Sequence, residues 1–588
     1  MTESVVQSFK FTGGLRNTAD STRLSNEELQ TCNNLYTKDG YLTKKYSPSN
    51  LEISSPTATL KSGTGITAGT HTYRVTFIAT VGGAEICAGS PSNAIVHTGT
   101  NLQTTLSNIP LQYTAGYTRN IYRNKVGDQN SWFLLTNIND NTTTTYVDST
   151  PDTSLTTALP TALLAYPQYL ATTFLDNKKI LIEVKSTGVI NEALYTTGSS
   201  VYSYINLGKT LTTTATTVFD STQVLDFFFL TNNVEMVQAK GNFGLFTNVS
   251  ATGFTNGIIC AFVKNFGNRL CAINCQDPTG TSKKFRTYYS TTVNYQDFGG
   301  VSSTQYFDVP DDGSQGITAA IMFKGSLYLF TTNACHRVDY TGDALLPFKV
   351  KQYVANFGCN KHHALLETRG MMIIWTTENQ LVAFDGFNVK RLDYNIKDLL
   401  ANAITDPICT YYHSTLNKFV LQVGSGSFVA DIDDLINNCK WEGSNTGADA
   451  SNIYGSVEIL LGTTKKVLLA KQTAQGMASY SQFDGSVASS DAASFTTGIS
   501  GASDAKTLIK RVTLFTLETN SDTPTFYVYD KAGTQQYSGT FPSTAILGTS
   551  IYPNVEVQDY YFSLSTTNSN LTRISRIDIE MEPTRRVM

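Results

Sequence analysis

One pattern recurs through residues 165–484 and restricts the fold more than any other feature of the sequence. In each copy an apolar run leads into a tight polar turn, followed by a second and then a third apolar run. The clearest copy is Ala319–Phe323, the turn Lys324-Gly325-Ser326, then Leu327–Phe330 and Ala334–Val338. Short apolar runs separated by turns of this kind are typical of β-hairpins. The region is therefore expected to consist of antiparallel strands.

The copies follow one another at intervals of about 40–50 residues, a period typical of β-propellers. One four-stranded blade cannot bury both of its faces alone, whereas radial stacking of several blades buries both. We expect about six or seven blades, because propellers usually have four to eight. Further copies begin at Leu170, Ile258, Ala364 and Ile408, and weaker ones lie at Val224–Val237 and Ile459–Ala470.

The chain as a whole is predicted to be all-β, with smaller modules on both sides of the repeats. Alternating Tyr73, Val75 and Phe77 indicate a sandwich strand. Ser25 and Glu28 have the spacing of a helix capping box, which predicts a short helix around residues 26–34. The predicted domains are an N-terminal docking arm (1–55), an immunoglobulin- or fibronectin-like β-sandwich (56–160), a β-propeller (161–484), a Ser/Ala/Gly-rich linker (485–505) and a C-terminal β-sandwich (506–588).

Composition agrees with a folded β protein and excludes several classes of function. Aromatic residues make up 11% of the 588 residues, which a disordered chain would not carry. The formal net charge is −4, so a basic nucleic-acid coat is not expected. No apolar run approaches the roughly 20 residues of a membrane span, and the polar residues Met1–Lys10 predict no secretion signal. The nine scattered cysteines are interpreted as buried free thiols of a chain made in a reducing cytoplasm.

The few candidate metal ligands predict no metal or cofactor site. Cys271 and Cys275 have no second pair at a matching distance, and strand alternation would put both on one face as core thiols. His362 and His363 are adjacent, so on a strand they would point to opposite faces, one buried and one exposed.

The candidate catalytic groups are also better explained by structure, and the chain is predicted not to be an enzyme. Asp308, Asp311 and Asp312 lie in a turn-rich loop, as do Asp431, Asp433 and Asp434, where turn formation explains the aspartates. Gly424-Ser425-Gly426-Ser427 is not a nucleophile elbow, because no helix follows it directly. Lys61-Ser62-Gly63-Thr64-Gly65 lacks the Gly-Lys-Ser/Thr ending of a phosphate-binding loop.

Several segments resemble one family of viral structural proteins. Residues 11–51, FTGGLRNTADSTRLSNEELQTCNNLYTKDGYLTKKYSPSNL, resemble the start of phage tail proteins, with their Gly-Gly-Leu, Asn-Glu and Gly-x-Leu-x-Lys/Arg elements. Residues 71–93 and 118–155 resemble the inserted β-sandwich of those proteins. FKGSLYLFTTNACHRVD (323–339) and MMIIWTTENQLVAFDGFNVKRL (371–392) resemble their propeller blades. The family is the tail nozzle, or tail tubular protein B-like, proteins of short-tailed bacteriophages.

The resemblance implies a virion tail protein that is made in the host cytoplasm. In that family six copies form a ring below a portal-bound adaptor. The ring continues the DNA channel, helps to retain the genome and conducts it during ejection, and fibres often attach at the junction with the adaptor. The implied partners are therefore five further copies of the chain, the adaptor, tail fibres and genomic DNA that passes without sequence-specific binding. We expect residues 1–55 and 506–588 to carry the assembly contacts.

Two other functions remain open from the sequence. The first is an adsorption protein that recognises host surface glycans through propeller loops, and saturable binding to such sugars would identify it. The second is a virion glycan depolymerase, which would require a pair of facing carboxylates.

Overall fold

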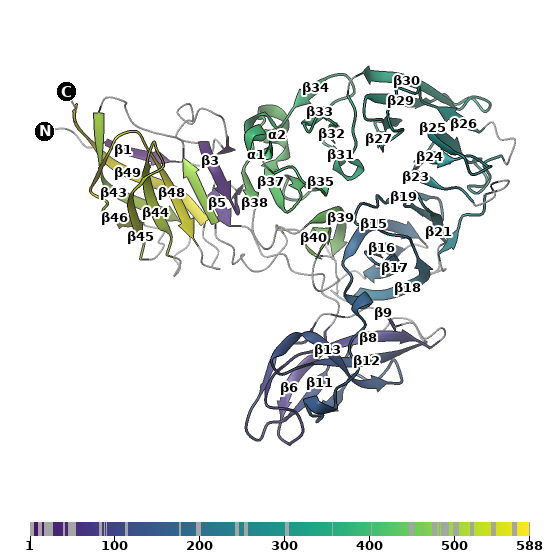
Figure 1. Cartoon of the computed structure of the whole chain (residues 1–588), viewed down its shortest axis with the longest axis horizontal. Helices are drawn as coiled ribbons and strands as arrows, with labels where there is room; N and C mark the ends of the chain where they lie inside the picture. Colours follow the sequence, from purple (N-terminus) through teal and green to yellow (C-terminus); the bar gives the residue numbers. More distant parts are fainter. Residues whose placement is uncertain are drawn as a thin grey trace.

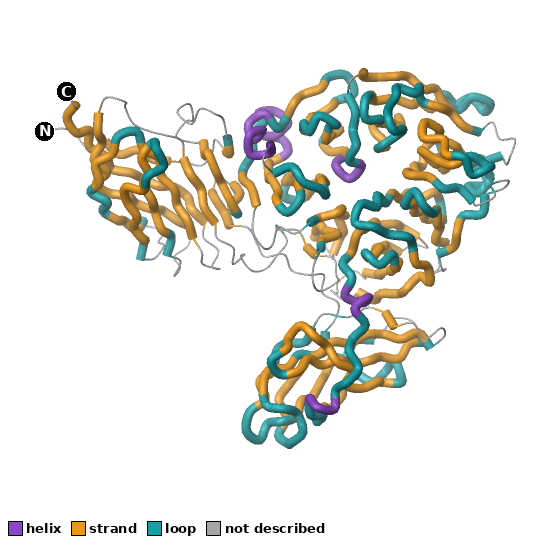
Figure 2. Tube along the Cα trace, in the orientation of Figure 1, coloured by secondary structure: helices purple, strands orange, loops and turns teal. Residues whose placement is uncertain are grey.

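Nearly all of the regular secondary structure in the described part of the computed structural model is β-strand (Figure 1; Figure 2). Within the described residues the strands form many small antiparallel sheets, so the predicted all-β class is confirmed. The residues described are 5–9, 14–16, 28–38, 41–44, 55–80, 85–86, 89, 91–111, 116–175, 178–195, 202–240, 246–251, 254, 257–299, 305–355, 357–401, 403–445, 452–461, 464–472, 479–480, 483, 493–497, 505–517, 523–542, 548–566 and 573–586.

Residues 167–480 contain seven consecutive sheets, called here the central sheets. Each is a simple meander in which neighbouring strands pair antiparallel. The two-residue turns Lys324-Gly325 and Arg369-Gly370 have positive φ at both positions, as type I′ hairpins require. The strands by sheet are β15 Pro167–Leu175, β16 Lys178–Lys185, β17 Val189–Tyr195, β18 Tyr202–Thr210; β19 Asp220–Val224, β20 Phe227–Thr231, β21 Met236–Lys240, β22 Thr247–Asn248; β23 Cys260–Phe266, β24 Arg269–Gln276, β25 Ser282–Tyr289, β26 Tyr306–Asp308; β27 Ala319–Phe323, β28 Ser326–Phe330, β29 Ala334–Tyr340, β30 Phe348–Ala355; β31 Leu365–Thr368, β32 Met371–Trp375, β33 Leu381–Phe384, β34 Val389–Arg391; β35 Ile408–His413, β36 Lys418–Val423, β37 Gly426–Asp431, β38 Gly443–Asn445; and β39 Ile453–Leu461, β40 Thr464–Lys471, β41 Ser479–Tyr480.

The first strands of the central sheets lie next to one another. Each first strand contacts the first strand of the following sheet, from β15 through β19, β23, β27, β31 and β35 to β39, and β39 in turn contacts β15. Apolar clusters fill the spaces between neighbouring sheets. One joins Val224 and Phe229 of the second sheet to Val263 and Leu270 of the third. The seven first strands are thereby brought next to one another.

Residues 57–148 form a separate two-layer unit, the inserted sandwich (Figure 1). One core is shared by its two larger sheets, with Ala58 and Leu106 from one and Val75 and Ile121 from the other. The turn predicted at Gly82-Gly83 lies outside the described residues. The strands are β6 Thr57–Lys61, β7 Gly69–His71, β8 Tyr73–Ala79, β9 Glu85–Ile86, β10 Ile95–His97, β11 Gln103–Ser107, β12 Tyr117–Lys125, β13 Asp128–Ile138 and β14 Tyr146–Asp148.

Strands from both ends of the chain combine in a third unit, the terminal sandwich, where the two termini also lie (Figure 1). Its first sheet has the order β4-β5-β49-β43-β46, with β1 paired to β49 and β47 to β43. Its second has the order β3-β42-β48-β44-β45, with β2 paired to β3. The strands are β1 Val5–Phe9, β2 Gly14–Leu15, β3 Glu28–Asn33, β4 Leu35–Lys38, β5 Tyr41–Lys44, β42 Ala493–Thr497, β43 Ala505–Thr516, β44 Thr525–Asp530, β45 Gln535–Thr540, β46 Thr549–Ile551, β47 Val555–Val557, β48 Tyr560–Thr566 and β49 Arg573–Arg586.

The terminal sandwich and the sixth central sheet share one continuous sheet of ten strands. Strand β3 lies beside β38, and the pairing is parallel at Asn33 and Ser444. The backbone N–H of Asn34 donates to the Ser444 carbonyl at 2.7 Å. A Cβ on Gly443 would lie 2.3 Å from the Leu35 carbonyl oxygen, so only glycine permits this close approach. The two units are joined by backbone hydrogen bonds as well as by a shared apolar core.

Two sequence predictions in the terminal sandwich were wrong. Residues 28–33 form strand β3 rather than a helix, because pairing with β42 and burial of Leu29 and Cys32 outweigh the capping-box spacing. Part of the predicted linker 485–505 forms β42, which lies between β3 and β48 with Phe495 fully buried. The rest of that linker, apart from Ala505 in β43, lies outside the described residues.

Helices are few and short among the described residues. Asp431 begins α2 by accepting hydrogen bonds from the backbone N–H groups of Asp433 and Asp434, a role for an N-cap aspartate. The helical segments are η2 Asp152–Ser154, η3 Thr161–Leu164, η4 His362–Ala364, η5 Tyr394–Ile396, α1 Lys397–Ala401 and α2 Ile432–Asn438.

Candidate functional site

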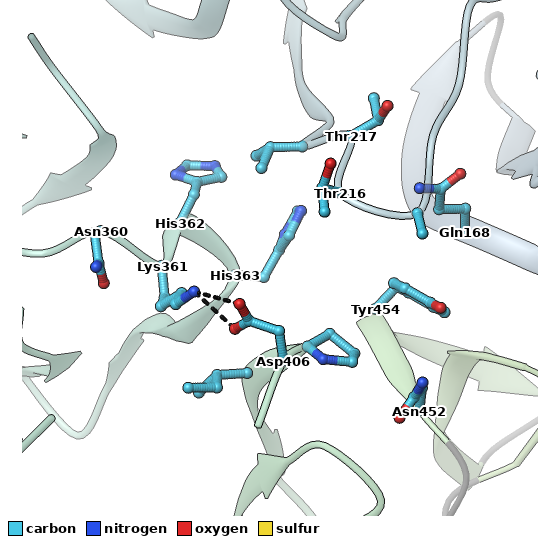
Figure 3. Close-up of a pocket in the computed structure, with 14 residues that line it drawn as sticks. Gln168, Thr216, Thr217, Asn360, Lys361, His362, His363, Asp406, Asn452 and Tyr454 are labelled. Atoms are coloured by element: carbon cyan, nitrogen blue, oxygen red, sulfur yellow. Dashed lines mark hydrogen bonds and ion pairs between the residues drawn. The ribbon is translucent and has the colours of Figure 1, made fainter. Parts of the chain in front are cut away.

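A cavity of about 390 Å³ lies where several first strands of the central sheets begin (Figure 3). Its lining comes from five segments that are far apart in sequence: Gln168, residues 215–218, residues 360–363, residues 406–408, and Asn452 with Tyr454. Each segment lies at the start of a first strand or immediately before one. The cavity is therefore a direct result of bringing these strand ends together.

The short turn η4 forms one side of the cavity and contacts several sheets. His362 packs on Phe262 of β23 with ring centroids 4.5 Å apart, and its Nδ1 accepts the backbone N–H of Ala320 in β27 at 3.4 Å. His363 packs against Tyr169 of β15 at 6.1 Å. The expectation that these histidines lie on a strand, one buried and one exposed, was wrong. They lie in a 3-10 turn, both are partly buried, and both line the cavity.

A cluster of charged groups lies behind His362. The Asp220 carboxylate accepts a hydrogen bond from Lys264 Nζ at 2.6 Å and another from the backbone N–H of Val263 at 2.9 Å. His362 Nε2 lies 3.3 Å from Asp220 Oδ1, with only 9% of the His362 side chain and 7% of the Asp220 side chain exposed. Because Nδ1 of His362 accepts a backbone proton, Nε2 is the nitrogen that donates to Asp220.

The surroundings shift the pKa values of Asp220, His362 and His363 on this side of the cavity. Burial alone would raise the pKa of Asp220, but the charge of Lys264 and the hydrogen bond from His362 lower it to about 2. Burial lowers the pKa of His362, and Asp220 opposes that change only in part. Burial and the neighbouring His362 lower the pKa of His363 to about 3. At neutral pH Asp220 is ionised and both histidines are neutral.

The remaining lining combines apolar and polar side chains, and its two formal charges are paired. Lys361 Nζ lies 2.7 Å from Asp406 Oδ1. The Tyr454 ring stacks on Tyr166 with centroids 5.5 Å apart and planes 15° apart, which fixes its position in the wall. Gln168 donates to the Thr214 carbonyl. Such a site can bind a small polar molecule, but it shows no nucleophile activated by a base.

The structure changes the interpretation of the cysteine pair. Cys271 and Cys275 both lie on β24, but they belong to apolar clusters on opposite faces of the sheet. A bulge between Ile273 and Cys275, with Asn274 at a φ of 51°, reverses the alternation. The prediction that both thiols share a face was therefore wrong. Both are free and buried, and burial raises the pKa of Cys271 to about 12. Cys87 lies outside the described residues.

The aspartates noted in the sequence are held by structural partners, and Asp431 and Asp433 share one, the side-chain amide of Asn417. Asp308 accepts two hydrogen bonds from Arg286, each at 2.8 Å. Asp312 accepts the Ser314 backbone N–H at 3.0 Å, and Asp431 caps α2. No group of three or more His, Cys, Asp or Glu side chains that could hold a metal ion occurs in the described part of the chain.

The two glycine-containing loops are also accounted for by the fold. Gly63 and Gly65 follow β6 and have positive φ, and the Gly63 backbone N–H bonds the Thr100 carbonyl at 2.9 Å. Gly424 and Ser425 form the turn between β36 and β37, so the segment is a hairpin. Among the described residues, no helix is both long and apolar enough to cross a membrane.

Comparison with known proteins gives no family. No family model and no curated protein matches the chain. One similar solved structure is the extracellular domain of the putative one component system BT4673 from B. thetaiotaomicron, with 12% identity, a TM-score of 0.31 and 66% of this chain covered. This chain spans 46% of that protein's length. A second is BBS1N in complex with ARL6DN, with 7% identity, a TM-score of 0.33, and coverage of 54% of this chain and 91% of that one. Both likenesses are too distant to bear on function.

Proposed function

We propose that the chain is a subunit of the tail nozzle of a short-tailed bacteriophage. In this proposal the central sheets are the blades of a seven-bladed β-propeller, and six copies of the chain form a ring below the portal–adaptor assembly. The ring retains the genome and conducts it during ejection, and the chain has no enzymatic activity. Its location is the virion tail, and its partners are the adaptor, tail fibres and passing DNA.

The observation that carries this proposal is the spread of the sequence resemblance over all three units. Residues 11–51 contribute strands to the terminal sandwich, residues 71–93 and 118–155 to the inserted sandwich, and residues 323–392 to the fourth and fifth central sheets. A chance likeness would not be expected to include each unit in the same order. The contacts between successive first strands, including β39 with β15, support the propeller.

Exposed apolar side chains support an assembled state. Leu345 and Leu346 in the turn between β29 and β30 are 87% and 73% exposed, and Phe387 in the turn between β33 and β34 is 83% exposed. Large apolar side chains that are exposed together often mark protein–protein contacts. We therefore assign the Leu345–Leu346 turn to a contact within the tail.

The net charge of the chain and the position of η4 both agree with a passive conduit. A net charge of −4 avoids the phosphate neutralisation that would hold DNA in place. His362 and His363 lie between the first strands and pack on Phe262 and Tyr169, so we place the DNA path between the subunits of the ring and not through one chain.

The test is negative-stain imaging with mass determination of the purified chain, alone and with the portal–adaptor assembly of the phage that encodes it. We expect a six-fold ring with a central hole. The double substitution Leu345→Ser/Leu346→Ser should leave a folded chain that no longer forms rings, whereas the matched control Lys349→Ser in the same hairpin should assemble normally. A monomer under both conditions would contradict the nozzle and favour the adsorption protein.

A further inference from the structure

The cavity of Figure 3 is not used by the proposed conduit, and its size suits a small ligand. Ligand pockets usually measure about 300–1,000 Å³, and about 390 Å³ lies near the lower end of that range. The lining comes from strand ends of sheets that pack firmly on one another, so the cavity is formed before any ligand arrives.

The electrostatics of the cavity favour an uncharged ligand. The charges of Lys361 and Asp406 compensate each other at 2.7 Å, and Asp220 is compensated by Lys264 at 2.6 Å. His363 is neutral at physiological pH, because burial lowers its pKa to about 3. A charged ligand would therefore lose hydration without gaining a free counter-charge in the cavity.

Hydrogen-bonding groups remain available for such a ligand. The ring nitrogens of His363 have no hydrogen-bond partner among the described residues, and a neutral imidazole offers one donor and one acceptor. Figure 3 shows the His363 ring extending from η4 towards Thr216. The Thr216 hydroxyl has a weak partner in Thr214 Oγ1 at 3.3 Å. This wall therefore offers both a donor and an acceptor to a ligand.

An apolar wall completes the chemistry. Tyr454, Pro407 and Val218 line the cavity together with the polar groups. Sugar rings combine apolar C–H faces with hydroxyl groups that both donate and accept, and they carry no charge unless they are oxidised or substituted. A cavity with an aromatic and apolar wall, a neutral imidazole, and hydroxyl and amide groups matches that combination.

We infer that this cavity is a binding site for a neutral carbohydrate of about one or two rings, the size that the cavity can enclose. His363 supplies a donor and an acceptor to sugar hydroxyls, Thr216 supplies a third polar contact, and Tyr454 packs against a C–H face. The inference does not depend on the nozzle, because a monomeric chain has the same cavity.

The test is saturation-transfer NMR and calorimetry of the full chain with glucose, galactose, N-acetylglucosamine, maltose and lactose, and with glucuronate as the charged probe. We expect at least one neutral sugar to bind saturably and glucuronate to bind at least about tenfold more weakly. His363→Phe, which keeps a ring but removes both nitrogens, should weaken binding at least about tenfold. Thr216→Val should weaken it severalfold, and the control Thr540→Val on strand β45 should not change it.

Longer oligosaccharides of the best sugar distinguish the source of the ligand. If the longer oligosaccharide binds as tightly as the short sugar, the end of a surface glycan can enter the cavity. If it binds more weakly, the cavity accepts only a free sugar. Both results support the site. The inference is overturned if no neutral sugar saturates, or if binding persists unchanged in both His363→Phe and Thr216→Val. If His363→Phe does not fold, Thr216→Val and the comparison with glucuronate still decide the question.

Discussion

At the scale of single residues, one buried carboxylate connects β19, β23 and η4. Asp220 receives hydrogen bonds from Lys264 and from the Val263 backbone, and His362 lies beside it. The adjacent His362 and His363 were noted as candidate ligands in the sequence, but their position in a turn was not predicted. Strand alternation would separate the two rings, whereas the backbone N–H of Ala364 bonds the Lys361 carbonyl at 2.9 Å and closes a turn instead. The rest of the cavity lining was not predictable, because its five segments extend over residues 168–454.

Removing the Asp220 charge should destabilise the chain strongly. Asp220→Asn leaves Lys264 largely buried without its counter-charge, and breaking a buried ion pair in this way costs about 3–5 kcal/mol. Chemical denaturation measures the change. The control Asp308→Asn removes a carboxylate that is 45% exposed beside Arg286 and should cost at most about 1 kcal/mol. Equal losses in the two variants would contradict the special role of Asp220.

His363 should make the stability of the chain depend on pH. Its pKa is about 3 in the folded chain and about 6.5 when unfolded, so the folded state resists protonation. The stabilisation is complete above pH 6.5 and is lost as the pH falls from 6.5 towards 3. Between pH 6.5 and 5 we expect wild type to lose about 1–2 kcal/mol more than His363→Gln. Parallel curves of unfolding free energy against pH would show that His363 does not contribute.

At the scale of elements, the repeated hairpins were predictable and the strands that join distant segments were not. Ala319–Phe323 and Met371–Trp375 were expected as strands, and both form with their type I′ turns, because apolar runs and turn residues are local signals. Strands β3 and β42 carry weak local signals and pair with each other across most of the length of the chain. From local propensity and composition alone, β3 was therefore predicted as a helix and β42 as part of a linker.

A pair of substitutions in β42 tests whether this segment is a core strand. Phe495 is fully buried in the terminal sandwich, so Phe495→Ala should cost about 3–5 kcal/mol in chemical denaturation. Ser494 is only partly buried on the same strand, and Ser494→Ala should change the free energy of unfolding by less than about 0.5 kcal/mol. A linker would tolerate both substitutions equally, which is the result that would contradict the assignment.

At the scale of the whole molecule, the two ends of the chain form one unit and the repeats form another. Strands β1, β4 and β5 belong to the same sheet as β43 and β49, and β3 lies inside the sheet that contains β42. The segment expected to be a docking arm is thus interwoven with the C-terminal strands. Its role in assembly remains a proposal.

Deleting residues 1–55 should unfold the terminal sandwich rather than merely abolish assembly. The deletion removes the partners of β42 and β49 and exposes their apolar faces. Hydrogen exchange should show loss of protection in β42, β48 and β49, while the inserted sandwich keeps its protection as an internal control. Retained protection in β42 would show that the C-terminal strands fold without the N-terminal segment.

The ten-stranded sheet has a mechanical consequence. Because β3 and β38 pair at Asn33 and Ser444, where Gly443 allows a close approach, a force applied to the terminal sandwich reaches the sixth central sheet through the backbone hydrogen bonds of this joint. A flexible tether would dissipate such a load as a change of angle. We expect the paired joint to restrict such a change of angle, so that a load on the terminal sandwich is passed to the sixth central sheet, whose strand β35 begins beside the cavity.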